Sequence, residues 1–105
     1  PAVVRLALLV DHYRSDRDWT AAALAEAEDR LARWRQAVAL DAGPDARPLL
    51  AAVRSHLADD LNTPAALGAV DRWVGQALAG QGSDSDAPAL AAATVDTLLG
   101  VALAR

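Results

Sequence analysis

Residues 20–40 of the chain read TAAALAEAEDRLARWRQAVAL, a run without glycine or proline that is rich in the strong helix former alanine. Apolar side chains recur in it at the three- and four-residue spacing of a helix that packs on one face. They are Leu24, Ala27, Leu31, Trp34 and Val38. Thr20 is a residue type that caps helix N-termini. The spacing therefore predicts one long amphipathic helix from Thr20 to about Leu40, ended by Gly43-Pro44.

Two further amphipathic helices are predicted between residues 45 and 80. Asp45 is expected to cap the first of them, with Pro48 in its first turn. Its apolar stripe is predicted to consist of Leu50, Val53, Leu57 and Leu61. Asn62-Thr63-Pro64 then breaks the chain, and we expect Thr63 to cap the next helix with Pro64 at its first position. The buried face of that helix is predicted to consist of Leu67, Val70, Val74 and Leu78, with Trp73 alongside.

The two ends of the chain predict one more helix each. Residues 80–85 contain two glycines and two serines, which predicts a flexible connection, and Asp86 is expected to cap the helix that follows. That last helix is predicted to bury Leu90, Val95, Leu98, Leu99 and Leu103. At the other end, the segment Ala2–Tyr13 is apolar around most of its circumference, so it requires burial on several sides.

Composition agrees with an all-α fold. The 105 residues are 53% hydrophobic and only 4% aromatic, with no Phe to build a β-rich core. We predict an up-and-down bundle of four amphipathic helices over residues 20–105, preceded by an apolar helix and connector over residues 1–19. Because a chain of this size can hardly cover the apolar helix on every side, we expect one side of it to face outward. The chain alone should then self-associate through Ala2–Tyr13, or this helix should be mobile.

Charge and residue content disfavour several classes of function. The net charge is −4 and every basic residue is arginine, which disfavours a nucleic acid as partner. The absence of cysteine excludes disulfides, thiolate catalysis and cysteine-ligated zinc. No apolar run is long enough to span a bilayer, and residues 2–10 lack the features of a signal peptide. We therefore expect a cytoplasmic protein without a membrane partner.

A search for chemistry yields no active site. His56, Asp59 and Asp60 could share part of one helix face, but a solvated helix face explains them more simply. There is no glycine-rich phosphate loop, nucleophile elbow or helix-borne zinc motif. Trp34 and Trp73 are assigned to the core and not to base stacking. We predict no catalytic, cofactor-binding or metal-binding residue in this chain.

Two motifs resemble the cysteinyl-tRNA synthetase family. The first is Val4-Arg5-Leu6-Ala7-Leu8-Leu9, followed by His12-Tyr13-Arg14-Ser15 and then Trp19-Thr20. The second is Leu57-Ala58-Asp59-Asp60-Leu61-Asn62-Thr63-Pro64-Ala65-Ala66-Leu67, which resembles that family's Asp-Asp-x-Asn-Thr-Pro-x-Ala-Leu signature. Further stretches look like one branch of the family, the cysteine ligases of mycothiol biosynthesis. They are Arg14-Ser15-Asp16 with Asp18-Trp19-Thr20, Arg33-Trp34-Arg35, Ala69-Val70-Asp71-Arg72-Trp73 and Leu98-Leu99-Gly100-Val101-Ala102-Leu103.

The resemblance implies a C-terminal helical domain, related to anticodon-binding bundles, of a ligase that uses ATP to join cysteine to the amine of glucosaminyl-inositol. ATP, zinc and the small-molecule substrates would be bound by an N-terminal catalytic domain, which is the expected partner of this chain. The chain alone would then be inactive, and His12, Tyr13 and Arg14 would pack at a helix end without contacting substrate. Two alternatives stay open. One is the tRNA-binding helical domain of a cysteinyl-tRNA synthetase, and the other is a stand-alone helical interaction domain.

Overall fold

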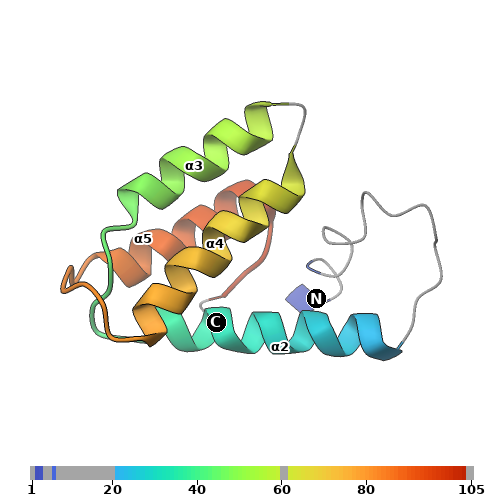
Figure 1. The fold of residues 1–105 in the computed structure, drawn as a ribbon, viewed down its shortest axis with the longest axis horizontal. Helices are drawn as coiled ribbons and strands as arrows, with labels where there is room; N and C mark the ends of the chain where they lie inside the picture. The colour runs from blue at the N-terminus through green and yellow to red at the C-terminus, as the bar shows by residue number, and fades with distance from the viewer. Residues whose placement is uncertain (1, 4–5, 7–20, 60–61, 104–105) are drawn as a thin grey trace.

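The described part of the chain is built from helices and the loops between them (Figure 1). The structure, a computed structural model, describes residues 2–3, 6, 21–59 and 62–103. Its helices are α2 (Ala21–Val38), α3 (Arg47–Ala58), α4 (Thr63–Leu78) and α5 (Ala87–Thr94), and a π-helical turn, η1 (Val95–Leu99), continues α5. No β-strand occurs among these residues. The prediction of an all-α fold is therefore confirmed.

The helix α4 lies between the other elements. It packs most extensively along α3, to which it is joined in a hairpin, and it also packs against α2 (Figure 1). The helix α5 contacts both α2 and α3. Both α4 and α5 pack against α2. Their contacts bury the apolar stripe of α2, and the opposite side of that helix is polar.

The core is made of small and branched side chains around two tryptophans, Trp34 and Trp73. Trp34 is completely buried, and the largest fully buried side chains beside it are Leu6, Val53, Val70, Val74, Val95, Leu99 and Val101. Buried alanines such as Ala37, Ala66 and Ala77 let the helices approach closely. Leu6 belongs to the same core as the helices, and Ala2 and Val3 pack against it.

Three predicted core positions are wrong. Leu24 and Leu78 are 38% exposed, and Leu49 is buried in α3 where Leu50 was expected. Leu24 lies near the N-terminal end of α2, three residues before the buried Ala27. Leu78 is the last residue of α4, and the helix extends past the core at this end. Of the other predicted stripe positions, Val38, Leu57, Leu90 and Leu98 are half-buried against the core, and Leu61 lies outside the described residues.

The starts of two helices, α3 and α4, differ from the prediction by one residue. Asn62, and not Thr63, is the N-cap of α4, because its Oδ1 accepts a hydrogen bond from Ala65 N at 3.3 Å. Asp45 lies one residue before the N-cap of α3, where its carboxylate accepts from Arg47 N at 3.0 Å. Asp86 occupies the N-cap position of α5 without a capping hydrogen bond from its side chain. Thr20, the predicted cap of α2, lies outside the described residues.

The last predicted helix is shorter than expected. Regular α-helix stops at Thr94, and η1 ends at Gly100, which has a left-handed backbone with φ of 72°. Glycine tolerates this conformation because it has no Cβ. The chain then turns back, and Val101 and Leu103 enter the core from a non-helical segment. Leu103 is thus buried as predicted, but not on a helix.

The connection over residues 80–85 is tied to the loop between α2 and α3. Gly43 and Asp84 exchange two backbone hydrogen bonds, of 3.1 and 3.0 Å, in an antiparallel bridge. Gly80 and Gly82 both have positive φ, which lets the chain reach this bridge. The prediction of a flexible connection overlooked these contacts.

The predicted division at residue 19 falls mostly outside the described part of the chain. Leu6 is the exception, since it is fully buried in the common core and cannot lie on an outward face of the predicted first helix. The remaining residues of Ala2–Tyr13 that would mediate self-association, apart from Ala2 and Val3, are not described. The helices of the described part include none that is long and apolar enough to cross a bilayer.

Candidate functional site

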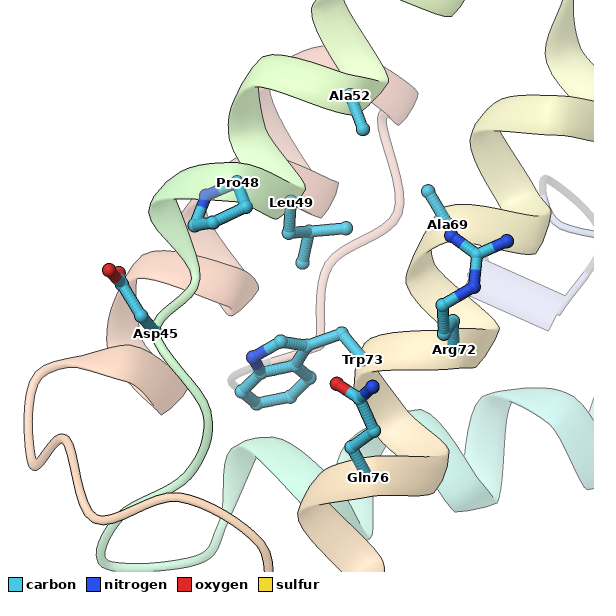
Figure 2. Close-up of a pocket in the computed structure, with 8 residues that line it drawn as sticks. All are labelled: Asp45, Pro48, Leu49, Ala52, Ala69, Arg72, Trp73 and Gln76. Atoms are coloured by element: carbon cyan, nitrogen blue, oxygen red, sulfur yellow. The ribbon is translucent and has the colours of Figure 1, made fainter.

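A shallow cleft of about 210 Å³ lies between α3 and α4. Figure 2 shows its two walls, one from each helix, with the Trp73 ring at one end. Ala52 and Ala69 are the small residues of the two walls, and their size leaves room between the helices. The cleft is lined by Asp45, Pro48, Leu49, Ala52, Ala69, Arg72, Trp73 and Gln76.

Two consecutive residues of the α2–α3 loop, Gly43 and Pro44, hold the Trp73 ring in place. Its Nε1 donates a hydrogen bond to the carbonyl oxygen of Pro44 at 2.8 Å. A Cβ built on Gly43 would lie 3.2 Å from Cζ2 of the ring, so the α2–α3 loop packs tightly against it. Trp73 is 4% exposed, and the cleft reaches only its edge.

The rim of the cleft carries two charged groups. Arg47 donates hydrogen bonds to both carboxylate oxygens of Asp45, at 3.1 Å or less, and its guanidinium lowers the pKa of Asp45 while the carboxylate raises the pKa of Arg47. Arg72 is exposed and has no ion-pair partner within the described part of the chain. The one carboxylate of the lining, Asp45, is exposed and paired with Arg47.

A second polar cluster joins α2 to α4. Asp71 on α4 accepts a hydrogen bond from Trp34 Nε1 at 2.8 Å through Oδ1, and its Oδ2 lies 2.9 Å from Arg30. The sequence analysis missed Asp71, because its partners are on another helix and a one-helix pattern does not reveal them. The sequence offered two signals: Asp71 lies within the stretch Ala69-Val70-Asp71-Arg72-Trp73 that resembles the ligase branch, and it directly follows Val70 of the predicted apolar face.

The structure describes only some of the candidate residues from the sequence. His56 is half-buried in the last turn of α3, Asp59 is exposed just after it, and Asp60 lies outside the described residues. Within the described ranges, no group of three His, Cys, Asp or Glu side chains could hold a metal ion. Trp34 and Trp73 are buried, which confirms their assignment to the core. His12, Tyr13 and Arg14 lie outside the described part of the chain.

Comparison with known proteins gives close relatives but no matching family model. The chain is 63% identical to L-cysteine:1D-myo-inositol 2-amino-2-deoxy-alpha-D-glucopyranoside ligase of Thermobifida fusca, over 105 residues that make up all of this chain and 26% of the relative. Proteins of the same name from Gordonia bronchialis and Nocardiopsis dassonvillei are 62% and 59% identical, over 99% and 98% of this chain and 25% of each relative. The chain is similar, over its whole length, to the C-terminal part of this ligase. The predicted resemblance to the ligase branch is thereby confirmed.

The chain spans about a quarter of the length of the ligases it matches. The motif at residues 57–67, which carried the resemblance to the family, lies at the junction of α3 and α4. Within it, Asn62 caps α4 while Ala66 and Leu67 are buried. In this chain the motif therefore has a structural explanation: it ends one helix, starts the next and contributes side chains to the core between them.

Proposed function

We propose that this chain is the C-terminal helical domain of an ATP-dependent ligase that joins cysteine to the amine of glucosaminyl-inositol in mycothiol biosynthesis. The observation that carries the proposal is the identity of 59–63% to three ligases over at least 98% of the chain. In this proposal the described helices supply packing surfaces. The proposal accordingly assigns the chemistry to the part of the ligase that this chain does not include.

In this proposal the N-terminal part of the ligase binds ATP, zinc, cysteine and the amino sugar substrate. The present chain is its partner within the same polypeptide, with residues 1–19 as connector and residues 20–105 as an up-and-down bundle related to anticodon-binding domains. The α3–α4 hairpin and the packing of α2 across α4 support that architecture. The burial of Leu6 in the core supports a connector that is anchored in the bundle.

The test compares the complete polypeptide that contains this chain with the 105-residue chain alone. The complete polypeptide is expected to catalyse cysteine-dependent pyrophosphate exchange with ATP, and to form the cysteinyl amide of glucosaminyl-inositol, detected by mass spectrometry. The chain alone is expected to show neither activity above background. Exchange by the isolated chain would contradict the assignment of chemistry to the N-terminal part.

The alternative of a tRNA-binding domain is tested in the same preparation. Transfer of cysteine to its tRNA by the complete polypeptide, without amide formation on the amino sugar, would favour the synthetase. Titration of the chain with that tRNA would then give a specific complex, for which a dissociation constant of about 10⁻⁸ M or tighter is typical. The net charge of −4 leads us to expect no such complex near physiological salt.

A further inference from the structure

We draw no further inference here: the strongest candidate, the shallow cleft between α3 and α4 with the exposed Arg72 on its wall, is an open and largely apolar groove, and nothing in the structure shows what covers it.

Discussion

The carboxylate of Asp71 joins two helices through its two oxygens. One oxygen accepts the indole N–H of the fully buried Trp34, and the other pairs with Arg30. These two contacts are expected to contribute differently to the free energy of unfolding. The indole N–H would be left without an acceptor if Asp71 were lost, whereas Arg30 and Asp71 are about 30% exposed, so water replaces much of the ion pair.

Removing this carboxylate is expected to cost more than neutralising it. Asp71→Ala leaves the Trp34 N–H unpaired and is predicted to lower the free energy of unfolding by about 1–3 kcal/mol. Asp71→Asn retains an oxygen acceptor for Trp34 and loses only the ion pair, for a predicted cost of about 1 kcal/mol or less. Urea denaturation followed by tryptophan fluorescence measures both. Equal losses in the two variants would show that the ion pair, and not the indole hydrogen bond, is the stronger contact.

At the scale of elements, the ends of the helices are specified locally and the loops are not. Asn62 caps α4 through a hydrogen bond three residues along the chain, and Gly100 ends η1 through its left-handed backbone. The connection after α4 depends instead on a loop more than thirty residues earlier, through the bridge of Gly43 and Asp84. The order of this connection is therefore a tertiary effect.

Two glycines of that connection provide a matched test of the bridge. Gly80 and Gly82 have nearly the same φ, +82° and +80°, but a Cβ on Gly80 would meet open space and one on Gly82 would lie 2.4 Å from Pro44 N. Gly80→Ala is predicted to cost about 1–2 kcal/mol from the left-handed backbone alone. Gly82→Ala carries the same cost and also a clash with backbone, so it is predicted to be clearly more destabilising and to open the bridge. Thermal unfolding compares the two variants, and faster exchange of the Gly43 and Asp84 amides in Gly82→Ala would report the opened bridge. Equal stabilities would mean that the connection moves aside without loss.

At the scale of the whole molecule, the N-terminal segment contributes to the core of the helices that follow it. Leu6 has no exposed surface and lies in the same cluster as Trp34, Val70 and Leu99. A leucine so placed loses both its transfer free energy and its packing when it is truncated. The stability of residues 21–103 is therefore expected to depend on residues before α2.

Leu6→Ala is predicted to lower the free energy of unfolding by about 2–5 kcal/mol. The matched control is Leu24→Ala, which truncates a leucine that is 38% exposed and is predicted to change stability by about 0.5 kcal/mol or less. Chemical denaturation of both variants, with circular dichroism as the signal, measures the difference. If Leu6→Ala were as mild as Leu24→Ala, the N-terminal segment would be dispensable for the core.

The site was predictable to a smaller extent than the fold. The sequence correctly indicated that Trp34 and Trp73 belong to the core, because both lie at helical spacing from other apolar residues. It did not indicate their polar partners, Asp71 and the carbonyl of Pro44, which are 37 and 29 residues away along the chain. The α3–α4 cleft was not predicted either, since its lining depends on how two helices pack.

Local rules were enough to predict the helical class, most of the apolar stripes and the break at residues 62–64, because periodicity and capping act over three or four residues. The sequence alone also predicted the similarity to the ligases, because motifs of consecutive residues carry that similarity. Tertiary packing determined which stripe positions are covered, so Leu24 and Leu78 are exposed while Leu49 and Leu6 are buried. It also determined that Arg30 pairs with Asp71, and that the 80–85 connection is tied to Gly43. The physical reason is the same in each case: these contacts join residues far apart in the chain, and their partners come together only when the helices pack.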